Sequence, residues 1–164
     1  MYSAFLYHSQ AMVPQDRDRS IYTMARAFNG PLGISGTLHR QGGTFTQYVE
    51  GPTEAVELVK ANILQDSRHR NIRVVCDGPV DTRYFDGWAM GYTTEQTCCW
   101  DSWAKSAGAP SDITLAPAKR LVEFLHYAHL INLPAHHVRD VQPGMRGRLK
   151  RLLPRISGGI AHQR

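Results

Sequence analysis

Two short segments in which apolar and polar residues alternate, 33–40 and 44–50, flank a Gln-Gly-Gly turn at 41–43. Alternation of this kind predicts β-strands, and a short connection that contains glycine predicts that the two strands pair as an antiparallel hairpin. A hairpin is not stable alone, so neighbouring helices or strands must cover at least one of its faces. The segments on either side are therefore interpreted as parts of one sheet and its covering layer.

A strand and a helix precede the hairpin. Residues 2–8 alternate roughly and contain aromatic side chains, which is typical of a strand. The next segment has apolar residues at the helical spacing i, i+3, i+4 and i+7, namely Ile21, Met24, Ala25 and Phe28. Asn29 and the Gly-Pro pair at 30–31 end this predicted helix, because neither glycine nor proline continues a helix well.

A second helix and two more strands follow the hairpin. Thr53 is placed as the N-cap of this helix. Its predicted apolar face consists of Ala55, Leu58, Val59 and Ile63. Strands are expected over 71–76 and 84–92, with a break at 78–79 (Gly-Pro) between them. The resulting order, βαββαββ, predicts an α+β ferredoxin-like sandwich with a mixed five-stranded sheet and two helices on one face.

The rest of the chain predicts a C-terminal helical cap and a tail. Residues 93–113 are polar and are interpreted as a connector, while 114–131 predict a third helix. One side of this helix carries Leu121, Val122, Leu125 and Ala128. That apolar side must pack against the open side of the sheet or against a partner subunit. We therefore divide the chain into a sandwich domain (1–95), a connector with the cap helix (96–133) and a basic tail (134–164) that we expect to be mobile.

The basic charge of the chain is concentrated in this tail. Residues 134–164 hold seven Lys/Arg and one acidic residue, whereas residues 1–133 hold twelve basic and thirteen acidic residues. The near-neutral folded part argues against nucleic-acid binding by that part. The tail could contact nucleic acid directly, with a steep salt dependence, but a solvated end or a segment that docks on an acidic protein is the more common role of such a run.

Other features of the composition exclude several classes. No apolar run approaches the ~20 residues of a membrane helix, and the N-terminus does not resemble a signal peptide, so we expect a cytoplasmic protein with no membrane contact. The three cysteines, two of them adjacent at 98–99, indicate free thiols rather than a disulfide framework. His126, His129, His136 and His137 are interpreted as surface histidines, and no metal site is expected.

Polar side chains fall where the predicted core should lie. On the second hairpin strand, Gln47 shares a face with Phe45 and Val49, so an amide would lie in the apolar layer. A buried amide without a hydrogen-bond partner costs about 1–3 kcal/mol. Asn29, at the end of the first helix, and Tyr7, on the first strand, are placed to provide one.

Tyrosine, glutamine and asparagine side chains offer hydrogen-bond donors and acceptors that do not ionise near neutral pH. This set suits a neutral, planar heterocycle with C=O and N–H edges, and it does not suit hydrolysis, which needs a positioned base or nucleophile. Each residue taken singly also has an ordinary structural explanation, in packing or at a solvated edge. The residues alone therefore predict a ferredoxin-like domain with room for a planar polar ligand between helices and sheet.

Four motifs resemble those of the BLUF family, the sensors of blue light that use FAD. GISGTL at 33–38 is similar to the family's G-I-T-G-x-L strand, and FTQYVEG at 45–51 to its F-x-Q-x-L-E-G strand. DSRH at 66–69 resembles its D-x-R-H helix end, and FDGWAMG at 85–91 its F-x-x-W-x-M-G strand. The resemblance covers 7–92, about half of the chain. Four motifs in the right order are far more specific than one.

The resemblance implies a role for each candidate residue. Tyr7 would give an electron and a proton to the excited flavin, with Gln47 between Tyr7 and the flavin O4/N5 edge. Asn29 would bond the C4=O/N3–H side, and Ser35 replaces a commoner threonine. The implied cofactor-binding set is Tyr7, Ile21, Asn29, Ser35, Gln47, Ile63, Asp66, Arg68 and His69. The implied photochemical set is Tyr7, Gln47, Trp88 and Met90, the last two on the predicted final strand, where they share a face with Tyr92.

The resemblance also implies a function. The 1–95 domain would be a blue-light photoreceptor that binds FAD non-covalently, in which rearrangement of the Gln47 hydrogen bond gives a red-shifted signalling state. With ~70 residues left, no enzyme domain of usual size fits, so the output would be altered binding to a downstream signalling protein, and we expect a homo-oligomer. The alternatives are a ferredoxin-like ligand-binding domain or a flavin-dependent redox domain without photoswitching.

Overall fold

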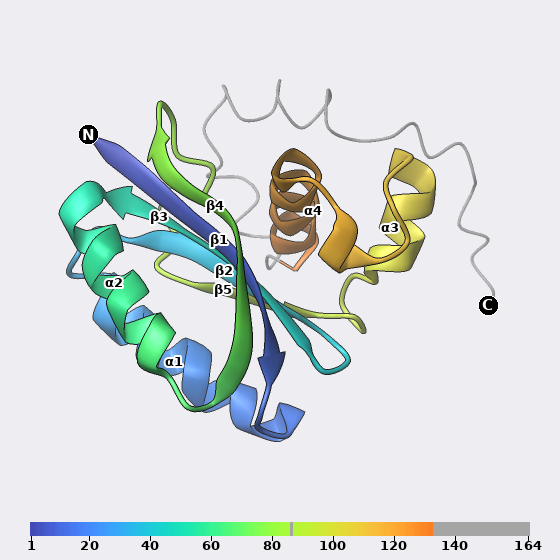
Figure 1. Ribbon diagram of the computed structural model, residues 1–164, viewed down its shortest axis with the longest axis horizontal. Helices are drawn as coiled ribbons and strands as arrows, with labels where there is room; N and C mark the ends of the chain where they lie inside the picture. Colours follow the sequence, from blue (N-terminus) through green and yellow to red (C-terminus); the bar gives the residue numbers. More distant parts are fainter. Residues whose placement is uncertain (86, 133–164) are drawn as a thin grey trace, which may run out of the picture.

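The structure is a computed structural model that describes residues 1–85 and 87–132. A five-stranded sheet forms the middle layer. The first two helices of the chain cover one face of this sheet and the last two cover the other (Figure 1). The predicted α+β ferredoxin-like sandwich is thus confirmed, and the C-terminal helices form the third layer.

The boundaries of the elements follow the sequence patterns closely at the N-terminal end. The strands are β1 (Tyr2–Ala11), β2 (Ser35–Gln41), β3 (Thr44–Pro52), β4 (His69–Val80) and β5 (Gly91–Thr94). The helices are α1 (Asp18–Asn29), α2 (Thr53–Gln65), α3 (Trp100–Ala107) and α4 (Ala118–Ile131), with short 3-10 turns at Gln15–Arg17 and Ile113–Leu115. The strand order is β4-β1-β3-β2-β5, and all pairs are antiparallel except β2 with β5.

The central strands are buried on both faces. Residues 3–9 of β1 and 45–51 of β3 are buried without interruption, although their side chains alternate between the two faces. Helices on both sides account for this, because neither face of β1 or β3 is left to solvent (Figure 1). The two faces therefore have separate cores, one under α1 and α2 and the other under α3 and α4.

The fifth strand is shorter than predicted. The described residues between Val80 and Gly91 are irregular, and a strand begins only at Gly91, where the chain pairs in parallel with β2. Gly87 has a φ of 86°, and the Trp88 amide donates to the Phe85 carbonyl oxygen at 3.1 Å, which closes a turn. Trp88 and Met90 therefore precede the strand instead of lying on it, which corrects the prediction.

The predicted break at 78–79 is also wrong. β4 runs on to Val80, and Pro79 is paired opposite Ser3 of β1. A proline is tolerated there because β4 is an edge strand, whose outward N–H groups need no partner strand.

The second helix differs from prediction in its cap and its face. Pro52 occupies the N-cap position, and the Thr53 hydroxyl donates to the Met1 carbonyl oxygen at 3.3 Å instead of capping the helix. Val56 and Val59 are the buried residues of α2, while Leu58, which was predicted to be buried, is 48% exposed. Val59 is buried as predicted, and Ala55 and Ile63 pack partly buried against the same core, so the predicted face is right except that Val56 takes the place of Leu58.

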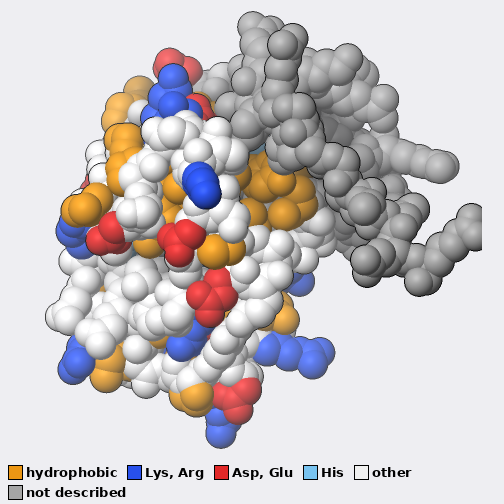
Figure 2. Space-filling model, turned by 90° about the vertical axis from the view of Figure 1, so that its right-hand side faces the viewer, with side chains coloured by type: hydrophobic (Ala, Val, Ile, Leu, Met, Phe, Trp, Pro, Cys, Tyr) orange, Lys and Arg blue, Asp and Glu red, His pale blue; other side chains and the backbone are white. Residues whose placement is uncertain are grey.

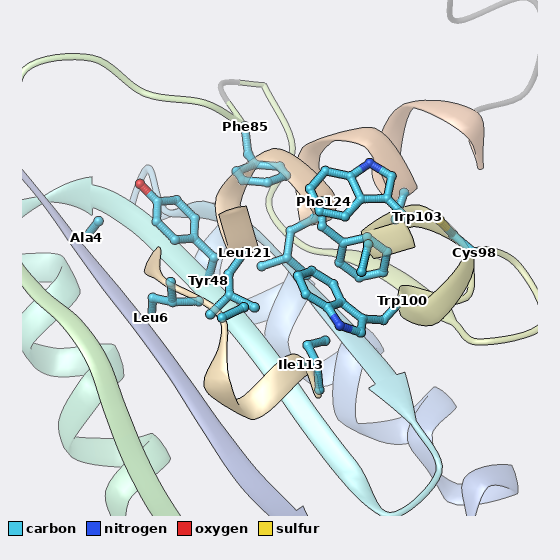
Figure 3. Close-up of a cluster of buried hydrophobic side chains, with 14 residues drawn as sticks. Ala4, Leu6, Tyr48, Phe85, Cys98, Trp100, Trp103, Ile113, Leu121 and Phe124 are labelled. Carbon is cyan, nitrogen blue, oxygen red and sulfur yellow. The ribbon is translucent and has the colours of Figure 1, made fainter. Parts of the chain in front are cut away.

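The C-terminal cap contains a helix that the sequence interpretation missed. Residues 93–113 include α3, which packs with α4 on the open side of the sheet, as was predicted for the cap helix. Trp100 and Trp103 of α3 contact the Phe124 ring of α4, with ring centroids 5.0 and 5.5 Å apart (Figure 3). Leu121 and Leu125 are fully buried in the same core.

Two histidines of α4 correct a further expectation. His126 and His129, predicted to lie on the surface, are 8% and 5% exposed, because the inner face of α4 is wide enough to include them. In the described part of the chain, no group of three or more His, Cys, Asp or Glu residues is arranged to hold a metal ion. His136, His137 and the 134–164 tail lie outside the described residues.

The described helices are all too short or too polar to cross a bilayer. On the face shown in Figure 2, acidic and basic side chains are interspersed with hydrophobic ones and form no single basic patch.

Candidate functional site

A cavity of about 380 Å³ opens between α1, α2 and the sheet. Its apolar wall is formed by Ile21, Met24, Ala25, Phe28, Leu38, Phe45, Val59 and Ile63. Its polar lining is formed by Tyr7, Asn29, Gln47, Asn62, Gln65, Asp66, Arg68 and His69. The predicted face of the first helix therefore faces the cavity, and this explains why Met24 and Phe28 are 61% and 45% exposed although they are apolar.

Tyr7 and Gln47 are brought together by the register of the central strands. They are direct partners in the antiparallel β1–β3 pair, and the Tyr7 hydroxyl donates a hydrogen bond to Gln47 Oε1. Burial, with a smaller contribution from the Asp66 carboxylate, raises the pKa of Tyr7 above its ordinary value. The phenol therefore keeps its proton at physiological pH and acts as a hydrogen-bond donor.

The other end of the Gln47 amide is held weakly. Its Nε2 donates to the Met90 sulfur at 3.7 Å, and a thioether is a weak acceptor. Gln47 lies on the cavity wall, so its amide group retains donor capacity toward that space. The Gln47 amide is thus held mainly at its oxygen, by Tyr7, and only weakly at its nitrogen.

Asn29 connects α1 with the segment before β5. It is the last residue of the helix and 2% exposed, and its Nδ2 donates to the Ala89 carbonyl oxygen at 3.1 Å. One turn earlier, Arg26 Nε donates to the Met90 carbonyl oxygen at 2.6 Å. These bonds fix the end of α1 against the backbone that carries Met90.

The polar edge of the cavity at the end of α2 is an ion pair. Arg68 donates to both carboxylate oxygens of Asp66, with Nη2 and Oδ2 separated by 2.6 Å. Burial by itself would raise the pKa of Asp66, but the Arg68 hydrogen bonds outweigh it and hold this pKa below its usual value. Asp66 is thus a carboxylate near neutral pH, and Arg68 is oriented by it.

His69 is held in one tautomer by its neighbours. Its Nε2 lies 2.9 Å from the Ile63 carbonyl oxygen, which can only accept, so Nε2 carries the proton. Nδ1 and the Ser9 hydroxyl oxygen form a second hydrogen bond at 2.8 Å. The imidazole ring lies 5.7 Å from the Tyr7 ring, and it completes the wall behind the phenol.

Three predicted residues, Ser35, Trp88 and Met90, do not line the cavity, although Met90 contacts the Gln47 amide. The Ser35 hydroxyl points to the opposite face of the sheet, where it donates to Glu50 Oε1 at 3.1 Å and accepts from Arg83. Ser35 therefore does not line the cavity, and Leu38, three residues further along β2, is the residue that faces it. The contact of Ser35 with the cofactor stays a prediction. Trp88 packs on the His129 ring of α4, with centroids 4.9 Å apart.

Sequence reasoning missed part of the lining. Asn62 and Gln65 on α2 and Leu38 and Phe45 on the sheet were not assigned to the site. The spacing of three between Asn62 and Gln65 places both on one side of the helix, next to Asp66. This short polar stripe beside Ile63 was the available signal.

Comparison with known proteins agrees with the motifs. Residues 2–91 match the family model described as BLUF, sensors of blue-light using FAD. The beta subunit of the photoactivated adenylate cyclase of Euglena gracilis is 37% identical over 93 residues, which cover 55% of this chain and 11% of that protein. Its alpha subunit is 38% identical over 81 residues, or 48% of this chain and 8% of that protein. The match thus spans about a tenth of the length of these relatives.

Solved structures extend the likeness into the cap. The photo-activated state of BlsA has a TM-score of 0.68 at 28% identity and covers 82% of this chain and 97% of its own. The dark state of BlrB, a BLUF protein, has a TM-score of 0.64 at 25% identity, with coverages of 80% and 97%. These coverages exceed the 2–91 match, so they include part of the helical cap. Because the family model matches more than half of the residues and its solved members share the layered fold, this chain belongs to the BLUF family of blue-light sensors that use FAD.

Proposed function

We propose that this chain is a blue-light photoreceptor that holds the flavin ring of FAD in the cavity between α1 and α2. The observation that carries the proposal is the bond between the Tyr7 hydroxyl and the Gln47 amide at the wall of that cavity. A light-driven hydrogen-bond switch needs a donor, an amide that can change its bonding, and a space for the flavin beside them. The buried phenol of Tyr7, the neutral amide of Gln47 and the cavity between the helices would provide these three.

The residues present fit a flavin ring. Ile21 of α1 and Ile63 of α2 lie on opposite walls, and a planar ring between the helices would cover the exposed parts of Met24 and Phe28. The neutral amides of Asn29 and Gln47 match a ring edge that alternates C=O and N–H groups. Phe28 lines the cavity without a hydrogen-bonding group, so the amides and Arg68 would bind the polar edge.

The bound flavin supplies the absorption of blue light and, when excited, an acceptor for one electron. Burial raises the pKa of Tyr7, so the group that would give up the electron is a neutral phenol, which becomes strongly acidic on losing it. Its proton would then move to Gln47 Oε1 while the amide nitrogen gives up one of its own protons toward the cavity, so that the amide gains no net charge. When the proton returns, the amide can settle in a second orientation, since its nitrogen is held only by the weak contact with Met90. Rotation of the amide would exchange the positions of Gln47 Oε1 and Nε2, and so change which of them faces the cavity.

We infer that the output is a change in binding, not catalysis. The relatives named as adenylate cyclase subunits are much longer than the matched region, so their activity is a property of those proteins. In this chain the cap, the tail or a second copy would pass the signal to a downstream signalling protein. A cytoplasmic location is supported by Cys76, Cys98 and Cys99, which are free thiols and suit a reducing compartment.

The test compares two glutamines of the cavity wall. Gln47→Leu is expected to keep FAD, because leucine preserves the volume, but to lose the light-induced red shift of the flavin absorption. Gln65→Leu, which changes the other lining glutamine, should keep both. Light-minus-dark visible spectra of the FAD-loaded proteins give the answer, and a normal red shift in Gln47→Leu would refute the proposed switch.

A further inference from the structure

The short segment that carries Trp88, Met90 and Gly91 lies between the photochemical side of the sheet and the cap. On the photochemical side, the Met90 sulfur accepts from the Gln47 amide at 3.7 Å. The Met90 carbonyl oxygen on the same residue accepts from Arg26 of α1 at 2.6 Å. A movement of the Gln47 amide nitrogen would therefore change its contact with Met90.

The other side of this segment meets the imidazole of His129. The His129 ring lies 4.9 Å from the Trp88 ring at 74°, and 5.8 Å from the Phe85 ring at 69°. A Cβ atom placed on Gly91 would come within 2.6 Å of His129 Nδ1, so the imidazole lies directly against the Gly91 backbone. A larger residue at 91 would displace the ring, because such a distance is shorter than any stable van der Waals contact.

The position of the His129 ring is set by packing. The side chain is 5% exposed, and within the described residues its Nε2 atom is buried without a hydrogen-bond partner. Such an atom costs about 1–3 kcal/mol. The histidine is therefore placed by the shape of its surroundings, Trp88 and Gly91, and not by a hydrogen bond from Nε2.

The C-terminal end of α4 is attached to β5, the strand that begins at Gly91. Asn132 Nδ2 donates to the Tyr92 carbonyl oxygen at 3.0 Å, one residue after Gly91. Together with His129, this bond ties the last turn of α4 to the start of β5. A displacement of the segment therefore cannot leave this turn of the helix unchanged, because packed interiors transmit small shifts.

We propose that His129 is a positioning residue that couples the orientation of the Gln47 amide to the cap helix α4. Met90 receives the change on one face of the sheet, and the next residue, Gly91, passes it to the imidazole on the other face. This inference rests on the proposed function, since it takes the rearrangement of Gln47 as its input.

The test uses the full chain loaded with FAD and measures two signals, the flavin red shift and the hydrogen exchange of α4 in the dark and under blue light. In the wild type, light should change the exchange of the last turns of α4. His129→Ala should keep the flavin shift and lose the light-induced change in exchange. His129→Phe should restore it, because the ring and not the nitrogen makes the contact. His126→Ala, which trims the neighbouring ring that packs on Phe85 at 5.6 Å, is the matched control and should respond like the wild type.

Three results separate the possibilities. An undiminished light-induced change of α4 in His129→Ala would overturn the role of His129, as would a wild type whose flavin shifts while α4 stays unchanged. A wild type without any flavin shift would refute the proposed function instead. If His129→Ala does not fold, ¹⁵N-histidine NMR of the wild type still decides, with the His129 signal assigned by its loss in His129→Phe. This signal should move on illumination, and a stationary signal beside a shifted flavin would overturn the inference.

Discussion

The two faces of the sheet are each covered by a pair of helices, but the two coverings differ in kind. Under α4, Leu121, Phe124 and Leu125 are fully buried, and three aromatic rings of α3 and α4 interlock (Figure 3). Under α1, the apolar residues Met24 and Phe28 remain about half exposed along a cavity wall. Where α3 and α4 meet the sheet, side chains thus fill the core, whereas the cavity between α1 and α2 is lined by apolar side chains that remain partly exposed.

Cavity volume does not by itself distinguish the two faces. A second space of about 660 Å³ lies beside α4, against β1 and β4, and is larger than the cavity under α1 and α2. Its lining is largely apolar, with His126, Glu123 and Lys119 at its edge. The Tyr7–Gln47 pair lies at the smaller cavity. The chemistry of the lining, and not the size, assigns the flavin to the α1–α2 face.

The largest expected effect comes from filling the cavity between α1 and α2. Ala25→Trp places an indole in the α1–α2 cavity and is expected to abolish flavin binding, while Val122→Trp fills the space beside α4 and should leave it intact. The measurement is the ratio of flavin to protein absorbance after reconstitution with FAD. The reverse pattern, with flavin lost only in Val122→Trp, would move the cofactor to the cap face.

Acid should destabilise the fold mainly through the face of the sheet that α3 and α4 cover. Burial lowers the pKa of both His39 and His129 to about 4, from 6.5; His126 and Arg26 add to the effect at His129, while Gln41 opposes it at His39. A lowered histidine pKa means that the unfolded chain binds more protons, so stability is complete above 6.5 and falls as pH drops toward 4.

The expected loss is about 2 kcal/mol per histidine between pH 8 and pH 5. Denaturant unfolding at the two pH values measures it. His39→Gln keeps a polar partner for Thr93 but does not titrate, so its pH-dependent loss should be smaller by about that amount. An equal loss in the variant and the wild type would show that His39 is not held neutral by its burial.

The smallest effect is expected from the tail. Deletion of residues 135–164 should leave flavin content, red shift and dark recovery unchanged, because the cavity and both helix pairs lie within the described residues. Dark recovery is measured by visible absorption after a light pulse. A severalfold slower recovery in the shortened chain would show that the tail is part of the sensor.

The site was predictable where local rules determine position. Tyr7 and Gln47 could be placed because strand alternation fixes which side chains share a face, and Asn29 because Gly-Pro ends its helix. Ser35 was assigned to the ligand by resemblance, although the alternation along β2 that buries Leu38 at the cavity points Ser35 to the opposite face.

The cap was less predictable because its structure depends on distant contacts. α3 has eight residues, which is too short to show a helical period, and it is held by Trp100 and Trp103 against Phe124. The burial of His129 depends on Gly91 and Trp88, which are brought to it by a turn at Gly87 that no alternation pattern reveals. Tertiary packing here overrides local preference.

The visible absorption spectrum of the purified wild-type protein, recorded in the dark and immediately after blue light, is the decisive test of the Tyr7–Gln47 switch. We expect a flavin spectrum that shifts slightly to the red and returns in the dark. A bound flavin whose spectrum stays fixed would contradict the Tyr7–Gln47 switch, and a protein that takes up no flavin from added FAD would contradict the assignment of the cavity itself.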